Sequence, residues 1–292
     1  MDISKLLIFH GTCNYSLIVM ESLRRHRSAG PEEETVTIPD VPCGLEMKRG
    51  QLPVSWSRVG LAEYEARMVK ADADSDGVLI NSFDEMESQF VEAYKSFGTL
   101  ERLGLRQAME IGEALKGTGR PVVWVVKQGE IESWVSRFGE GLDWLVIVGW
   151  APQVVILSHK AVGGFMTHRG WNSIIEGLCA GVPMVTWPLF GEQFLNERVV
   201  VEVLKVGVGV GIEVQTWWGE EVVMGREEIG VALERVMGIG EEGEERRKRV
   251  REVGEMAKKA MEVGGSSYVN MTVFIEDVKG YVKKENVVVN GL

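Results

Sequence analysis

A short polar segment that follows an apolar run carries the residues with the clearest chemical potential. It reads Thr-His-Arg-Gly-Trp-Asn-Ser over residues 167–173, and helix-forming residues then continue to a glycine at position 181. Glycine before a helix start lets a ligand approach the exposed backbone N–H groups, and the helix N-terminus carries about half a positive charge. The segment therefore predicts a phosphate-binding site, to which His168, Asn172 and Ser173 add side-chain hydrogen bonds.

Glu176 lies one helical turn beyond Asn172, on the same predicted helix face. A carboxylate in that place has the acceptor oxygens to bind two hydroxyls of a ribose. An ordinary capped helix is the alternative, because asparagine and serine are favoured caps, and His168 and Trp171 would then simply pack. The segment alone leaves both interpretations open.

This segment sits in a regular alternation of short apolar strands and helices. We expect strands at residues 122–126, 145–148, 162–166, 182–187 and 206–212, with helices at 103–116, 152–157, 173–180 and 193–205 and further helices to about residue 280. Earlier in the chain we expect strands at 6–9 and 77–82, helices at 14–26, 61–70 and 84–95, and a long surface loop over 27–60. The alternation predicts a parallel sheet covered on both faces, which binds ligands outside the carboxyl ends of its strands.

Composition excludes several classes of protein. The 292 residues include 32 basic and 43 acidic side chains, and the net charge of −11 argues against nucleic acid and anionic membrane surfaces as partners. Three cysteines without a CxxC pair argue against a zinc site or a disulfide framework and favour a reducing compartment. No apolar stretch approaches the roughly 18 residues that span a bilayer, so we expect a cytoplasmic protein without a stable membrane anchor. The 35 glycines suit tight strand-to-helix turns.

The polar segment is part of a longer run in which many dispersed positions are specific. This run opens with Trp-Ala-Pro-Gln at residues 150–153, closes with Trp-Pro-Leu-Phe-Gly-Glu-Gln at 187–193, and is 44 residues long. It resembles, nearly position for position, the signature box of plant family 1 UDP-glycosyltransferases. Further landmarks of that family stand at residues 9–12, 81–83, 96–99 and 264–267. The resemblance implies a GT-B-like α/β fold, with a Rossmann-type donor domain built on a parallel sheet and a partial N-terminal α/β domain.

The resemblance also implies a set of residues that bind the sugar donor. Trp150 would stack on uracil, Gln153 would lie near the ribose, and Glu176 would hold the ribose hydroxyls. The diphosphate would be contacted by His168, Asn172 and Ser173, and the sugar by Trp171, Glu192 and Gln193. The full set expected is Thr99, Trp150, Ala151, Gln153, His168, Trp171, Asn172, Ser173, Glu176, Glu192 and Gln193. Glutamine at the last position is associated in the family with glucose, so UDP-glucose is the expected donor.

Two departures from the family bear on activity. The family's general-base histidine and the aspartate that orients it have no visible counterpart, and a positioned base is worth about 10²- to 10⁴-fold. His10 is the histidine near the right domain, and we expect it to be structural rather than a replacement base, so no catalytic residue is identified. The family also has an interdomain linker and a buried strand before the loop at 96–99, whereas here residues 92–95 run directly into it. We interpret the chain as N-terminally truncated and internally deleted, with a central donor-sheet strand missing.

Other patterns are weaker. Three aspartates at positions 72, 74 and 76 imitate a calcium loop, but position 12 of that loop is Phe83 where a bidentate glutamate is required. We therefore expect a charged turn there and neither a metal nor a cofactor. Arg169 stands where the family usually has cysteine, and we expect it to point to solvent.

Two functions remain as hypotheses. One is inverting transfer of glucose from UDP-glucose to a hydroxyl of a small plant metabolite, a phenolic or terpenoid aglycone. The other is a non-catalytic remnant that binds UDP-sugar or another protein. The domains expected are a partial acceptor-side domain at 1–95, a donor domain at 96–265, and a C-terminal helix and tail at 266–292. The partners expected are UDP-glucose and a small hydroxylated acceptor, bound by a monomer.

Overall fold

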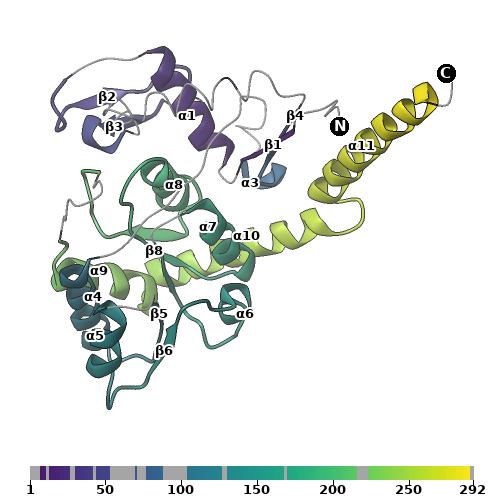
Figure 1. Ribbon diagram of the computed structural model, residues 1–292. Helices are drawn as coiled ribbons and strands as arrows, with labels where there is room; N and C mark the ends of the chain where they lie inside the picture. The colour runs from purple at the N-terminus through teal and green to yellow at the C-terminus, as the bar shows by residue number, and fades with distance from the viewer. Residues whose placement is uncertain are drawn as a thin grey trace.

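The chain forms two α/β halves, which Figure 1 shows one above the other in a computed structural model. The structure describes residues 7–10, 13–26, 30–41, 44–52, 70, 77–87, 104–126, 130–167, 170–215 and 223–289. The helix expected at 61–70 and the acidic turn at 72–76 lie outside the described residues, apart from residue 70. So do Thr99, His168 and Arg169.

The first half contains a parallel strand pair and a small antiparallel hairpin. Its elements are β1 (Leu7–His10), α1 (Asn14–Arg25), β2 (Thr35–Thr37), β3 (Glu46–Lys48), the 3₁₀ turn η1 (Arg49–Gln51), β4 (Gly77–Ile80) and α3 (Asp84–Glu87). β1 pairs with β4 in parallel, and β2 pairs with β3 antiparallel. The loop expected over 27–60 is therefore wrong in part, because strands of three residues are too short to show a period in the sequence.

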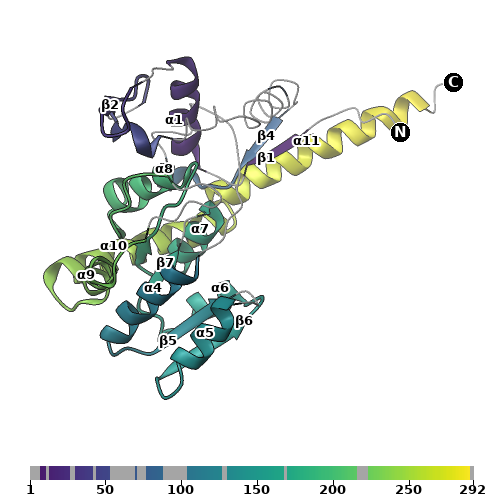
Figure 2. The ribbon, with the colours of Figure 1, turned by 60° about the vertical axis from the view of Figure 1, so that its left-hand side comes forward.

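The second half alternates strands and helices, as the sequence predicts. Its elements are α4 (Leu105–Gly117), β5 (Val122–Val126), α5 (Glu130–Phe138), β6 (Trp144–Val148), α6 (Gln153–Leu157), β7 (Phe165–Thr167), α7 (Trp171–Ala180), β8 (Met184–Thr186), α8 (Gln193–Arg198), the π-helical turn η3 (Val199–Val203), β9 (Gly207–Gly209), α9 (Arg226–Met237), α10 (Glu241–Met261) and α11 (Ser266–Val289). The sequence analysis missed α5. Helix α11 extends away from the rest of the chain in Figure 2.

Two separate parallel sheets form the described part of the second half. β8 lies between β7 and β9, while β5 pairs with β6, with Val123 opposite Leu145. Within the described residues, β5 has no strand partner besides β6, and β7 has none besides β8. This split agrees with a missing central strand, but the segment at 91–97 lies outside the described residues, so that expectation stays a prediction.

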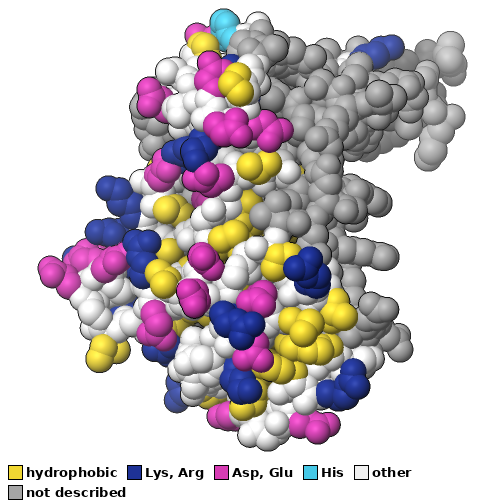
Figure 3. Space-filling model, turned by 90° about the vertical axis from the view of Figure 1, so that its left-hand side faces the viewer, with side chains coloured by type: hydrophobic (Ala, Val, Ile, Leu, Met, Phe, Trp, Pro, Cys, Tyr) yellow, Lys and Arg dark blue, Asp and Glu magenta, His cyan; other side chains and the backbone are white. Residues whose placement is uncertain are grey.

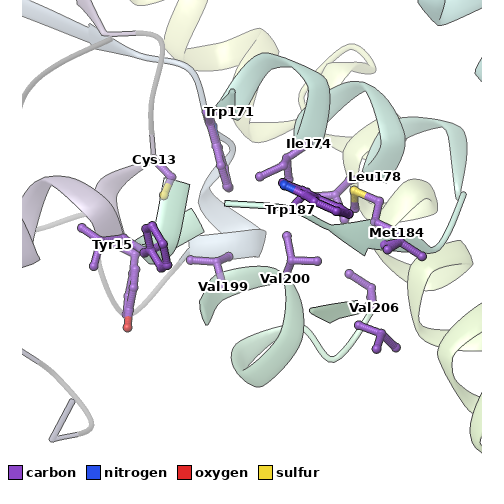
Figure 4. Packing of buried hydrophobic residues seen from close by; sticks show 14 of the residues in the cluster. Cys13, Tyr15, Trp171, Ile174, Leu178, Met184, Trp187, Val199, Val200 and Val206 are labelled. Carbon is purple, nitrogen blue, oxygen red and sulfur yellow. The ribbon is translucent and has the colours of Figure 1, made fainter. Parts of the chain in front are cut away.

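The hydrophobic core is continuous across both halves. It is built around α7, β8 and η3, and Figure 4 shows Ile174, Leu178 and Val200 around Trp187, with Cys13 and Tyr15 of the first half at its edge. Helix α7 ends at Gly181, whose φ of +70° is the left-handed conformation that closes helices and favours glycine. This turn returns the chain to β8, and because β7 and β8 are parallel, the loops after them, where the sequence predicts a ligand, lie at one edge of the sheet.

Hydrogen bonds also join the two halves. Ser16 on α1 donates to Asn196 on α8 over 2.7 Å, and both residues are fully buried. The Gln215 backbone N–H donates to the Gly50 carbonyl over 3.2 Å. Ser266, at the start of α11, donates to Glu85 on α3 over 2.8 Å. These bonds fix how the halves sit, although the domain boundaries expected from the sequence stay predictions.

Candidate functional site

The head of α7 lies at the carboxyl edge of the three-stranded sheet and begins with a glycine cap. β7 ends at Thr167, and Gly170 is the N-cap of α7, so no side chain caps the first turn. The first N–H groups of a helix have no partner within the helix and favour an anion. This geometry fits the phosphate site that the sequence predicts.

Three of the predicted donor-binding side chains contact one another beside this helix end. Gln153, at the start of α6, donates from Nε2 to a Glu176 carboxylate oxygen over 2.7 Å and to the Ser173 hydroxyl oxygen over 3.2 Å. All three are half-buried. Gln153 thus orients the Glu176 carboxylate, which has further acceptor capacity for hydroxyl groups.

One aromatic side chain that precedes this cluster in the sequence is highly exposed to solvent. Trp150, three residues before Gln153, is 84% exposed, which is unusual for a side chain of its size. Ala151 accepts the Gln153 backbone N–H over 2.8 Å and so fixes the turn that leads into α6. An exposed indole offers a face on which a planar base can stack.

Two other members of the predicted set lie deeper. Glu192 and Gln193, at the start of α8, are 2% and 0% exposed. Gln193 accepts the Leu189 backbone N–H over 2.8 Å, which shapes the loop after β8. Their contact with a sugar stays a prediction, as do the roles of Thr99 and His168.

The hydrogen-bond partner of Trp171 and Asn172 was not expected from the sequence. Asn81, which follows β4 in the first half, donates from Nδ2 to the Asn172 side-chain oxygen over 2.7 Å. The buried indole of Trp171 donates to the Asn81 carbonyl oxygen. Asn81 stood out in the sequence only as part of a landmark, and nothing there indicated which residues it contacts.

One titrating group adjoins the cluster. Cys179 is exposed at the surface, yet partial desolvation of its thiol raises the thiol pKa, and the negative charge of Glu176 raises it further. Cys179 is therefore a weak nucleophile at neutral pH.

Comparison with known proteins bears on what this site does. Residues 80–238 match the family model described as UDP-glucoronosyl and UDP-glucosyl transferase. UDP-glycosyltransferase 73C11 of Barbarea vulgaris is 35% identical in an alignment that covers 96% of this chain and 70% of that protein. UDP-glycosyltransferase 73C3 of Arabidopsis thaliana matches with the same identity and coverage.

This chain belongs to the UDP-glycosyltransferase family. Among solved structures, the crystal structure of Glycyrrhiza uralensis UGT73P12 complexed with glycyrrhetinic acid 3-O-monoglucuronide is similar, with a TM-score of 0.83, 32% identity, and coverage of 96% of this chain and 70% of that one. A UGT transferase from Siraitia grosvenorii in complex with UDP gives a TM-score of 0.75 and 26% identity, covering 94% of this chain and 77% of that one. The expected GT-B-like α/β fold is thereby confirmed.

The UDP-glycosyltransferase alignment also shows an internal difference in length. It is 349 positions long but takes in 96% of this chain, about 280 residues, so the relative has about 69 positions without a counterpart here. Within the described residues no helix has the length and apolar character needed to cross a membrane.

Proposed function

We propose that this chain binds UDP-glucose at the head of α7 and transfers the glucose, with inversion, to a hydroxyl of a small phenolic or terpenoid metabolite. The observation that carries the proposal is the contact of Gln153 with Ser173 and Glu176 at an uncapped helix start. The helix end offers positive charge for a diphosphate, the carboxylate offers acceptors for ribose hydroxyls, and Trp150 offers a stacking face. No metal or further cofactor is part of the proposal.

The proposed reaction is a single displacement. The acceptor hydroxyl loses its proton to a base as its oxygen forms a bond to the anomeric carbon. The bond from that carbon to the β-phosphate oxygen breaks, and UDP leaves with the electron pair. Negative charge grows on the diphosphate as the bond breaks, so the N–H groups at the head of α7 bind the leaving group more strongly in the transition state.

The base is the unassigned part of this mechanism. Of the histidines whose side chains the structure describes, His26 is exposed and bonded to Asp40 over 2.8 Å. His159 accepts a bond from the Ala161 backbone N–H over 3.3 Å. Neither contact involves a residue of the predicted donor site.

Binding of UDP-sugar without turnover is the second candidate. Two observations favour it: the described donor sheet is split between β6–β5 and β7–β8–β9, and the relatives have about 69 aligned positions that this chain lacks. An incomplete sheet can retain the site at the head of α7 and still fail to align an acceptor for attack.

Two experiments on one sample test the proposal. Isothermal titration with UDP is expected to show binding at one site per chain, which Glu176→Ala weakens and the exposed control Glu227→Ala does not. Incubation with UDP-glucose and a panel of phenols and terpenoid alcohols is then expected to yield glucosides. Binding without any glucoside would leave the second candidate, and absence of UDP binding would contradict both.

A further inference from the structure

One residue of the first half makes two hydrogen bonds to the head of α7. Asn81 comes directly after β4, and its side-chain Nδ2 donates to Oδ1 of Asn172 over 2.7 Å. Its backbone carbonyl accepts the bond from Nε1 of Trp171. These two partners are the first two residues of α7, so the carboxyl ends of β4 and β7 meet at the predicted diphosphate site.

The two bonds restrict Asn81 at both its backbone and its side chain. Trp171 is only 1% exposed and belongs to the core cluster, so its indole is a fixed anchor. The bond from this anchor holds the Asn81 carbonyl, and the Asn81 carboxamide then reaches Asn172. Asn172 itself is exposed, so its bond to Asn81 is a contact that favours one orientation of its amide.

The chemistry of an asparagine side chain gives this contact a consequence. A carboxamide has one acceptor oxygen and one NH₂ group that donates. Because Asn81 donates to the oxygen of Asn172, the NH₂ group of Asn172 is not used in this contact and is left to donate to another acceptor at the helix start. In that orientation it adds a donor to the backbone N–H groups that face an anion there.

We propose that Asn81 is a positioning residue for the donor site, which holds the Asn172 amide so that its NH₂ group donates to the diphosphate. This inference rests on the proposed function and extends it to the first half of the chain. It also links the halves, because a shift of β4 relative to α7 would release the Asn172 amide.

The test measures UDP and uridine side by side. Isothermal titration with each ligand is done on the full chain and on Asn81→Ala, Asn172→Ala and the double variant, with Asn270→Ala on α11 as the control. Asn81→Ala keeps the backbone carbonyl that Trp171 uses, so the anchor remains. Residues in direct contact are usually coupled in their effects, and we expect Asn81→Ala to weaken UDP binding about three- to tenfold. Uridine, which has no phosphate, is expected to bind all five proteins equally.

The double-mutant cycle separates positioning from general damage. In the Asn172→Ala background, Asn81→Ala is expected to cause no further loss of UDP affinity. Equal weakening in both backgrounds, or equal weakening for UDP and uridine, would overturn the inference. So would an unchanged UDP affinity for Asn81→Ala in the otherwise unaltered chain.

A second variant tests the amide orientation directly. Asn81→Asp has no donor, so the Asn172 NH₂ group is expected to turn toward the new carboxylate and leave the diphosphate. We expect UDP binding to weaken more than with Asn81→Ala, with the excess absent in the Asn172→Ala background. An excess that persists in that background would reflect charge repulsion alone and would count against the inference. If the unaltered chain fails to bind UDP, the proposed function itself fails. If the unaltered chain binds UDP but the Asn81 variants do not behave as stated, only the inference about Asn81 fails.

Discussion

The two parallel sheets of the second half differ in how completely they are covered. In the β7–β8–β9 sheet, all three residues of the central strand β8 are buried. In the β5–β6 sheet, Val123 and Val125 are each 45% exposed and Leu145 is 58% exposed. The other face of this sheet is covered in part, because Trp144 packs on Trp124 and on Phe138 of α5 with ring centroids 5.8 and 5.6 Å apart, although Val148 at its end is 46% exposed.

The comparison shows that apolar composition does not by itself bury a strand. β5 reads Val-Val-Trp-Val-Val and is at least as apolar as β8, which reads Met-Val-Thr. Parallel strands are ordinarily covered on both faces, and β8 is buried because it has a strand on each side and contacts helices α7 and α9. Figure 3 shows hydrophobic side chains gathered on the lower part of the molecule, where Figure 1 places α5, β5 and β6.

The largest expected effect is on stability. Val185→Ala in β8, where the side chain is 1% exposed, is expected to lower the free energy of unfolding by about 2 kcal/mol, from lost burial and the cavity that remains. The matched Val123→Ala in β5 is expected to cost well under about 1 kcal/mol, because that side chain is already half in water. Urea unfolding of both variants measures the difference, and equal losses would show that the sheets are equally covered.

The next largest effect is on UDP affinity, and it tests which of the two sheets lies beside the donor site. Glu176→Ala is expected to weaken UDP binding about tenfold, a loss of about 1.4 kcal/mol. The Glu176 carboxylate lies on α7, next to the well-covered sheet, and Gln153 holds it in the place proposed to bind the ribose hydroxyls. Leu145→Lys in β6 is expected to leave UDP affinity unchanged. Isothermal titration distinguishes the two. A Leu145→Lys variant that loses UDP binding would place the ligand on the β5–β6 side.

The order of helices and strands in the second half could largely be predicted from the sequence. Short apolar runs and glycine-terminated helices fixed the order of elements, and α7 was expected at 173–180 and observed at Trp171–Ala180. The β2–β3 hairpin could not be predicted, because its strands are three residues long and held by pairing rather than by a pattern. Exposure of β5 also could not be predicted from its own residues, since it depends on which strands lie beside it.

A smaller effect concerns association. The exposed face of β5 and β6 is expected to promote self-association at high protein concentration, because contiguous apolar surface favours contact between molecules. Changing Val123 and Val125 together to threonine keeps the β-branched shape and adds hydroxyl groups, so it is expected to reduce self-association while leaving the fold intact. Sedimentation velocity over a range of concentrations measures this, and Val231→Thr, 61% exposed on α9, is the control. If self-association is the same in the double variant and in the control, this face is not the surface through which the molecules associate.

The candidate site was predictable in its residues but not in its contacts. The family resemblance implied Gln153, Ser173 and Glu176 as donor-site residues, and the structure brings these three side chains into contact, although their binding of a donor stays a prediction. The bonds from Asn81 to Trp171 and Asn172 span about ninety residues of sequence, and only the packing of the two halves creates them. Contacts of that kind depend on tertiary structure, which a local pattern does not encode.

The smallest effect is on the reactivity of Cys179. Partial desolvation and the Glu176 carboxylate raise the pKa of this thiol, so less thiolate is present at neutral pH and alkylation is slow. Glu176→Gln removes the negative charge and is expected to move the pH profile of alkylation at Cys179 to lower pH, with a modest rise in rate near pH 8. Peptide mass spectrometry after iodoacetamide treatment reports Cys179 separately from the other cysteines. A profile that moves to higher pH would contradict the stated effect of Glu176.

Amide hydrogen exchange with and without UDP tests the location of the donor site most directly. If UDP binds at the head of α7, peptides covering Trp171–Ala180 and the start of α6 are protected by UDP, while a peptide covering Val122–Val126 in β5 exchanges at the same rate in both conditions. Unchanged exchange over α7 at saturating UDP, or protection confined to β5 and β6, would contradict a donor site at the head of α7.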